Sequence, residues 1–140
     1  YLALAEARHR PRLGERLELR CADLGDSVAA TAALAPGGFD LIHAALLFEY
    51  LEPARLLPVL AGALAASGWL AVLLQLPAAG HGAVTETPFT GVRVLEPLLT
   101  LRDPADFAAA AQAAGLRGAG AETLALPTGK RFHLSYWRRA

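Results

Sequence analysis

Cysteine and methionine are scarce in this sequence, whose 140 residues include one cysteine, Cys21, and no methionine. A single cysteine cannot form an internal disulfide and leaves no cysteine cluster for zinc. The four histidines are scattered without metal-ligand spacing, so the sequence predicts no metal site. One unpaired cysteine fits a reducing compartment, and we expect a cytoplasmic protein. Because a gene product normally begins with methionine, we do not expect Tyr1 to be the true start.

Excess charge and long apolar runs are absent as well. Thirteen basic and thirteen acidic residues give a formal net charge of zero. This balance argues against a nucleic-acid partner, whose affinity comes largely from neutralised phosphates. No apolar run reaches the roughly eighteen residues of a membrane span, and residues 1–20 lack the apolar core of a signal peptide. We therefore expect neither a nucleic-acid nor a membrane partner.

Several signature motifs of enzymes are missing. The sequence has no Gly-x-Gly-x-x-Gly fingerprint, which disfavours a nucleotide-binding oxidoreductase. It also lacks a Walker loop, a Gly-x-Ser-x-Gly nucleophile motif and a nucleophilic triad. What remains is a chain with 54% hydrophobic and 19% charged residues. That composition and length predict one folded domain with a sizeable core.

Residues 39–51 carry the clearest pattern of the chain. Residues 39–44 are a short, nearly unbroken apolar run after the turn Pro36-Gly37-Gly38, which is typical of a strand buried on both faces. A helix begins at Pro53, a favoured residue for the first helical position. A strand, a loop and a helix make half of a βαβ unit, and ligands bind outside the carboxyl ends of such strands. Residues 43–50 should therefore border any site.

The other elements follow from periodicity, caps and turn residues. Asp103-Pro104-Ala105-Asp106 is the clearest helix start, with aspartate as cap and proline at the first position. Residues 77–90 read as a long loop, expected to be the most mobile internal segment, and 91–101 as an extended segment. We predict helices at 1–10, within 23–35, at 53–66 and at 103–115, and strands at 17–22, 39–44, 69–76, 121–126 and 131–137.

Three stretches together resemble a known family, the class I S-adenosylmethionine-dependent methyltransferases. Phe39-Asp40-Leu41-Ile42, followed by small residues and Phe48-Glu49-Tyr50-Leu51, is similar to the family's fourth strand and its sequel. Cys21-Ala22-Asp23-Leu24 is similar to the end of the preceding strand, and residues 66–72 to the entry of the fifth. The resemblance covers essentially the whole chain. The glycine-rich loop that opens the family's fold has no counterpart here.

The resemblance implies an α/β fold: a Rossmann-like three-layer sandwich whose mostly parallel sheet ends in an antiparallel C-terminal hairpin. It makes residues 1–140 a single methyltransferase-like domain that is incomplete at its N-terminus. In the family, two strands separate the strand matching 17–22 from the one matching 39–44. Without them, strand 17–22 would have to pair directly with 39–44, a second copy would cover the open edge, or an upstream segment must exist. We expect a homo-oligomer or a missing upstream segment, rather than direct pairing.

The resemblance also implies a cofactor, S-adenosylmethionine. Asp23 matches the acid that accepts a hydrogen bond from the adenine amino group, and Leu24 the residue whose backbone lies near the ring. The alternative for Asp23 is a loop aspartate that makes a turn bond. His43, Ala44 and Ala45 match cofactor-facing positions, although a lone strand histidine is more often a packed or surface residue.

Glu49 and Tyr50 are the candidates on the substrate side. They match a pair that is often Glu-His in related enzymes, and tyrosine, with a pKa near 10, stays neutral and can only orient a substrate. Glu49 has the alternative of an exposed residue at a helix start. The family's Asn-Pro-Pro-aromatic signature for nucleobase amines is absent, since Ala45-Leu46-Leu47 stands there. No catalytic residue can be identified.

The sequence thus predicts methyl transfer from S-adenosylmethionine to a small-molecule acceptor. The alternative is a non-catalytic remnant or subunit that acts through protein–protein contacts. The missing glycine loop and the missing acid for the ribose hydroxyls motivate this second hypothesis.

Overall fold

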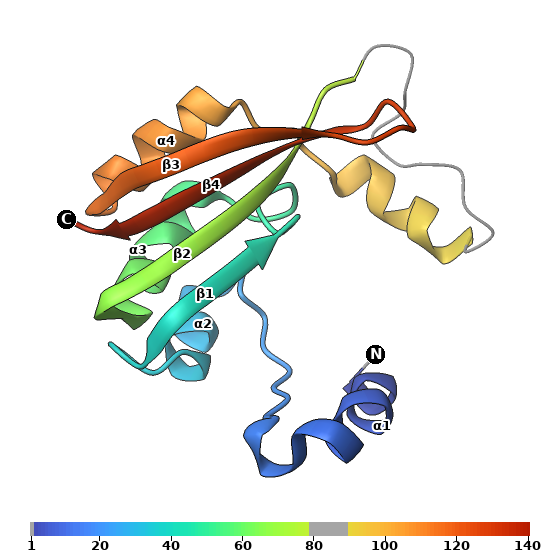
Figure 1. Cartoon of the computed structure of the whole chain (residues 1–140), viewed down its shortest axis with the longest axis vertical. Helices are drawn as coiled ribbons and strands as arrows, with labels where there is room; N and C mark the ends of the chain where they lie inside the picture. Colours follow the sequence, from blue (N-terminus) through green and yellow to red (C-terminus); the bar gives the residue numbers. More distant parts are fainter. Residues whose placement is uncertain (1, 79–89) are drawn as a thin grey trace.

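The protein is described by a computed structural model that covers residues 2–78 and 90–140. Its centre is a four-stranded sheet in the order β1-β2-β4-β3 (Figure 1). The strands are β1 (Phe39–Ala45), β2 (Leu64–Leu76), β3 (Leu116–Ala125) and β4 (Arg131–Arg139). β1 and β2 are parallel, and β4 is antiparallel to both β2 and β3. Three strands therefore run in one direction, which confirms the mostly parallel α/β sheet with its antiparallel C-terminal hairpin.

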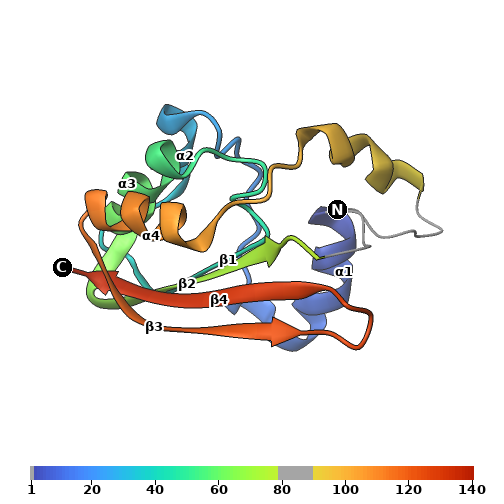
Figure 2. The same ribbon diagram turned by 90° about the horizontal axis from the view of Figure 1, so that it is seen from above.

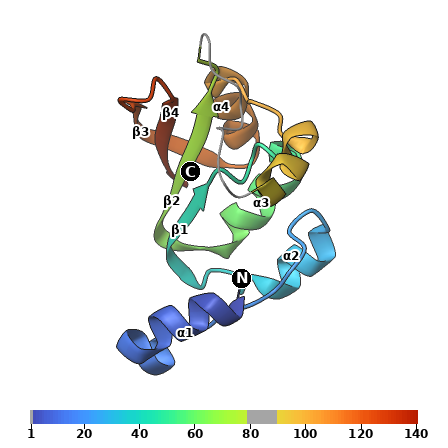
Figure 3. The same ribbon diagram turned by 90° about the vertical axis from the view of Figure 1, so that its right-hand side faces the viewer.

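Helices cover one face of this sheet. Figure 2 shows α2 (Ser27–Ala33), α3 (Pro53–Ala63) and α4 (Pro104–Ala113) together above the strands. α1 (Leu2–Leu13) has no buried residue and packs chiefly on the 3-10 helix η1 (Gly14–Arg16), apart from the sheet (Figure 3). No described helix packs on the opposite face, where Leu41 of β1 is 61% exposed. The third layer of the predicted sandwich is thus not formed by the described residues.

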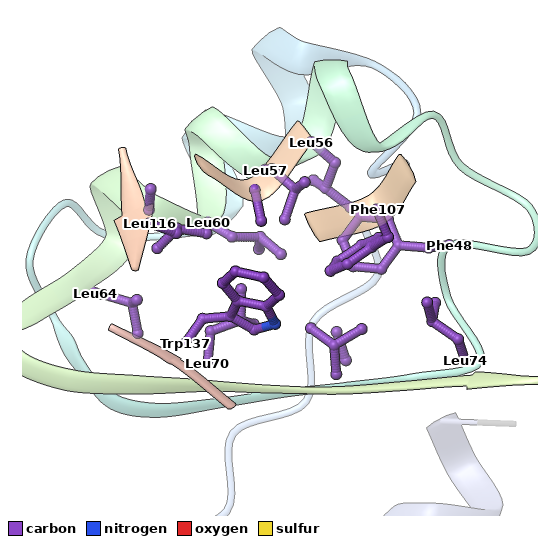
Figure 4. Close-up of a cluster of buried hydrophobic side chains, with 14 of the residues drawn as sticks. Phe48, Leu56, Leu57, Leu60, Leu64, Leu70, Leu74, Phe107, Leu116 and Trp137 are labelled. Atoms are coloured by element: carbon purple, nitrogen blue, oxygen red, sulfur yellow. The ribbon is translucent and has the colours of Figure 1, made fainter. Parts of the chain in front are cut away.

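The core lies between the three helices and the sheet (Figure 4). Phe107 of α4 lies at the centre of the aromatic contacts in this core. Its ring packs edge-on against Phe48, with ring centroids 4.9 Å apart, and against Trp137 of β4, with ring centroids 6.0 Å apart. Burying each such side chain stabilises the fold by about 1.5–3 kcal/mol. Leucines complete the cluster, notably Leu56, Leu57 and Leu60 of α3 and Leu70 and Leu74 of β2.

Two helices begin at aspartate caps, of which the sequence predicts the one at Asp103. The Asp103 carboxylate accepts hydrogen bonds from the backbone N–H groups of Ala105 at 2.7 Å and Asp106 at 3.4 Å. Asp26 does the same for the first turn of α2. These bonds satisfy donors that a helix start otherwise leaves unpaired. Both helices lie where the sequence predicts them.

The predicted strand at residues 17–22 is wrong. These residues belong to no helix or strand, and no described strand lies along the outer edge of β1. Direct pairing of 17–22 with 39–44 is therefore contradicted. The segment is held instead by Arg20, whose guanidinium donates to the carbonyl of Ala33 at 2.8 Å and pairs with Glu18 at 2.6 Å. Alternation alone cannot make a strand without a neighbour that takes up its backbone groups.

Other boundaries also differ from the predicted ones. Residues 91–101 were expected to be extended, but Thr90–Leu98 form the 3-10 helix η2. α3 ends at Ala63 and β2 begins at Leu64, so Ser67 and Gly68 lie inside the strand rather than stopping the helix. A Cβ at Gly68 would stand 2.6 Å from the carbonyl oxygen of Phe39, beside the register shift between β1 and β2, so only glycine fits. The first helix runs past Pro11. Most of the predicted loop 77–90 lies outside the described residues.

Candidate functional site

The turn that follows β1 is the centre of the candidate site. Because β1 and β2 are parallel, their carboxyl ends meet at one edge of the sheet. The N–H of Leu46 still donates to the carbonyl of Leu73 at 2.9 Å, and the chain then leaves the sheet through Leu46 at φ 54°. A left-handed conformation costs a residue with a side chain about 1 kcal/mol or more. Leu46 is therefore held against a local preference, and it opens residues 46–52, here called the β1–α3 turn.

Two residues far along the chain hold this turn in place. The Arg102 guanidinium donates to the carbonyl of Phe48 at 3.0 Å and to that of Leu51 at 3.4 Å. It also pairs with Glu52 at 3.2 Å. The N–H of Thr100 donates to the carbonyl of Glu49 at 2.8 Å. The segment that leads into α4 thus fixes the backbone of the turn.

Glu49 points into the protein from this turn. It is 1% exposed, and its Oε1 accepts a hydrogen bond from the backbone N–H of Gln75 at 2.6 Å. Among the residues that the structure describes, none donates to Oε2. Burial raises the pKa of Glu49, opposed by the Gln75 hydrogen bond and by the charge of Arg102. The alternative of an exposed helix-start residue is wrong, and a carboxyl group this buried offers no surface to a substrate.

Tyr50 and Leu46 face outward from the same turn. Tyr50 is 39% exposed and Leu46 is 38% exposed. Tyr50 is therefore accessible next to the carboxyl edge of the sheet, which is compatible with the predicted substrate side. Its role there stays a prediction. Glu49 and Tyr50, neighbours in sequence, have opposite environments.

The turn at Asp23 lies beside the β1–α3 turn. A Cβ built on Gly25 would stand 3.4 Å from Cδ2 of Leu51, so these two segments are in contact. Leu24 and Leu51 are both half-buried against the core. The structure therefore places the turn that holds Asp23 and Leu24 beside Leu51 of the β1–α3 turn, and the role of both residues at a cofactor site stays a prediction.

Asp23 makes a side-chain hydrogen bond within its own turn, as the alternative prediction for this residue stated. Its Oδ1 accepts from the N–H of Gly25 at 2.8 Å, and the side chain is exposed. Among the described residues, Oδ2 has no hydrogen-bond partner, so one acceptor remains available. A hollow of ≈ 600 Å³ lies next to it, lined by Arg20, Cys21, Ala22, Asp23, Ala29, Ala32 and Ala33. The two readings of Asp23 are thus compatible with each other.

The three residues at the end of β1 point in alternate directions. Ala44 is 3% exposed and packs in the core below the helices. His43 and Ala45 are exposed on the opposite face, where their register partners on β2 are Ala71 and Leu73. Only the backbone of Ala44 can therefore reach a ligand at this edge. The side chains of His43 and Ala45 remain accessible.

The part of the chain that the structure describes has neither a metal-binding cluster nor a membrane-spanning helix. No group of three or more histidine, cysteine, aspartate or glutamate residues is arranged to hold a metal ion there. No helix among residues 2–78 and 90–140 is long and apolar enough to cross a membrane.

Several solved methyltransferases have the same fold as this chain. The trans-methyltransferase CalH, crystallised with S-adenosylhomocysteine, superposes with a TM-score of 0.73 at 16% identity over 99% of this chain. The 1,6-didemethyltoxoflavin-N1-methyltransferase of Burkholderia thailandensis, crystallised with bound 1,6-didemethyltoxoflavin and S-adenosylhomocysteine, gives a TM-score of 0.68 at 16% identity over 96% of this chain. The cyclase SpnF gives 0.70 at 14% identity over 98%. Over the part it spans, the chain has the fold of class I S-adenosylmethionine-dependent methyltransferases.

This chain is shorter than the proteins it resembles. It spans 40% of the CalH chain, 62% of SpnF and 56% of the Burkholderia enzyme. No protein-family model matches the sequence, and a search of curated proteins finds no match. At these levels of identity, the likeness to these structures shows a shared fold alone.

Proposed function

We propose that this chain is part of an S-adenosylmethionine-dependent methyltransferase that acts on a small molecule. The observation that carries the proposal is the contact between the Asp23–Gly25 turn and the β1–α3 turn at the carboxyl edge of the sheet. In open α/β sheets this edge is where ligands bind. CalH and the Burkholderia enzyme, which share the fold, were both crystallised with S-adenosylhomocysteine. A cytoplasmic location is part of the same proposal.

The described residues fit the adenosyl part of such a cofactor. Oδ2 of Asp23 is an exposed acceptor without a described partner, and a carboxylate accepts strongly from an exocyclic amine. Leu24 is half-buried and offers an apolar surface to a ring. Bound there, the cofactor would supply an activated methyl group. Asp23, Leu24, His43, Ala44 and Ala45 remain the proposed cofactor-binding residues.

The role proposed for the protein is positioning rather than acid–base chemistry. Methyl transfer is an in-line displacement, in which orientation and exclusion of water can supply much of the rate. In this proposal, Tyr50 orients an acceptor through its hydroxyl group, and its 39% exposure supports that role. No acid–base pair at this edge is evident among the described residues, which is compatible with such a reaction.

A second candidate is a protein that keeps the fold without methyl transfer. SpnF is a cyclase with the same fold, so this fold hosts more than one chemistry. The uncovered sheet face, with Leu41 61% and Trp69 38% exposed, favours a role through protein contacts. This observation is independent of the Asp23 turn.

Calorimetry separates the two candidates. The 140-residue chain is titrated with S-adenosylmethionine and, separately, with S-adenosylhomocysteine, and adenosine serves as a partial ligand. The proposal expects saturable binding of both cofactor forms. Absence of binding by a chain that unfolds cooperatively would contradict the proposal and favour the second candidate.

A further inference from the structure

We propose that Glu49 is a positioning residue, whose carboxyl group clamps the β1–α3 turn to the end of β2 and thereby fixes Tyr50 and Leu46 at the site. The inference rests on the proposed function only in assigning this turn to a ligand site. The clamp itself is a matter of hydrogen bonds and burial.

The first argument is the position of the Gln75 N–H in the β1–β2 ladder. The parallel ladder pairs Ala45 with Leu73, and the N–H of Leu46 donates to the carbonyl of Leu73 at 2.9 Å. β1 then leaves the sheet, so the next donor of β2 on this side, the Gln75 N–H, has no strand to receive it. Oε1 of Glu49 accepts it at 2.6 Å. The Glu49 carboxyl group thus takes the place of the backbone carbonyl acceptor that β1 would supply if it continued in the sheet.

The second argument is that the turn is held from both sides. Glu49 fastens it to β2 through its side chain, while the N–H of Thr100 donates to the Glu49 carbonyl at 2.8 Å. The buried ring of Phe48 packs on Phe107 on one side of Glu49. Tyr50, on the other side, is exposed by 39%. The direction in which Tyr50 leaves the turn is therefore set by the bonds of its neighbour.

The third argument is the free energy that it costs to bury the carboxyl group of Glu49. Glu49 is 1% exposed, and within the described chain its Oε2 receives no hydrogen bond. Among the described residues, Arg102 is the charged side chain that acts on this carboxyl, and its guanidinium is shared with two carbonyls and with Glu52. Burying a carboxyl group with incomplete pairing is unfavourable. A group of this kind at the ligand edge of a sheet is more typical of functional sites than of a passive core.

The test uses the amide signal of Gln75 in nitrogen-15 NMR spectra of the 140-residue chain. The variants are Glu49→Gln, which keeps an acceptor oxygen, Glu49→Ala, which removes it, and the control Glu122→Gln at an exposed acid of β3, which β4 and β2 separate from β1. From about pH 4 to about pH 8, the Gln75 amide should titrate in the parent and in Glu122→Gln but stay still in Glu49→Gln. In Glu49→Ala the Gln75 amide should exchange faster with solvent, and the ring signals of Tyr50 should shift.

Calorimetry with S-adenosylhomocysteine adds the functional readout. Glu49→Ala should weaken binding by about tenfold, while Glu49→Gln and Glu122→Gln should stay within about threefold of the parent. A Gln75 amide that titrates unchanged in Glu49→Gln would overturn the clamp. Equal affinity of Glu49→Ala and the parent would overturn its role in positioning. If the parent chain binds no S-adenosylhomocysteine, the proposed function fails, and the Gln75 and Tyr50 signals still decide the clamp.

Discussion

At the scale of single residues, one buried carboxyl group should make the stability of the chain depend on pH. Burial raises the pKa of Glu49 above its ordinary value of 4.5, so the folded chain holds this proton more tightly than the unfolded chain. The stabilisation is complete below pH 4.5 and is lost as the pH rises through the folded pKa. One titrating group changes the free energy of unfolding by at most about 1.4 kcal/mol per pH unit.

Urea unfolding of the parent and of Glu49→Gln from about pH 4 to about pH 8 measures how the free energy of unfolding depends on pH. The free energy of unfolding of the parent should fall relative to that of Glu49→Gln as the pH rises above 4.5. All other titrating groups are shared, so they cancel in the difference. Parallel pH profiles for the two proteins would refute the assignment.

Asp23 carries the second prediction at this scale. Replacement by alanine removes the free Oδ2 acceptor and should weaken binding of S-adenosylmethionine or S-adenosylhomocysteine by about 1–3 kcal/mol. Glu122→Ala, at an exposed acid of the edge strand β3, which β4 and β2 separate from β1, is the matched control and should bind like the parent. Both variants need to unfold like the parent. Unchanged affinity in a folded Asp23→Ala chain would remove Asp23 from the site.

The side chains of the candidate site were only partly predictable. The sequence places residues 43–50 at the end of a strand, and the structure confirms that location. The sequence does not show which side chains of this strand point into the core, because both faces of the strand carry apolar residues. In the structure, Ala44 is buried, whereas His43 is exposed. The partners of the turn, Thr100 and Arg102, lie some fifty residues further on, and no local pattern links them to it.

At the scale of elements, the N-terminal cap of α4 should carry measurable stability. Asp103→Ala loses two hydrogen bonds to the first turn and should lower the free energy of unfolding by about 0.5–2 kcal/mol. Asp106→Ala removes an acid from the same turn but no cap, so only its smaller interaction with the helix dipole is lost. Urea titration of both variants measures the difference. Equal losses would show that charge, not capping, matters here.

Elements set by local signals were predictable, whereas those set by distant partners were not. The caps Asp26 and Asp103 act within a few residues, and both helices appear where the sequence places them. Residues 17–22 alternate like a strand, yet a strand needs a neighbour, and none of the described strands lies beside them. The boundary between α3 and β2 was also missed. Ala65 and Ala66 favour a helix in isolation, whereas in the structure they belong to β2 and lie in the register shift between its pairs with Phe39 and Leu41 of β1.

At the scale of the whole molecule, the sheet has surfaces that sheets of this kind rarely leave open. No described strand pairs with the outer edge of β1, and no described helix covers the face that carries Leu41 and Trp69. Arg138 stacks on Trp69 at 4.8 Å from the ring centroid, which shields part of that face. Open strand edges and apolar patches are the usual starting points of association between chains.

We therefore expect the isolated 140-residue chain to self-associate, with β1 at the contact. In sedimentation experiments its average mass should rise with concentration. Leu41→Lys places a charge on a side chain that is 61% exposed, so it should shift the equilibrium toward the monomer at little cost in stability. Val28→Lys, at a residue of α2 that is 77% exposed, is the control, because α2 lies on the helical face of the sheet. A chain that stays monomeric at every concentration and unfolds cooperatively would show that the open edge is tolerated, and equal effects of the two lysines would place the contact elsewhere.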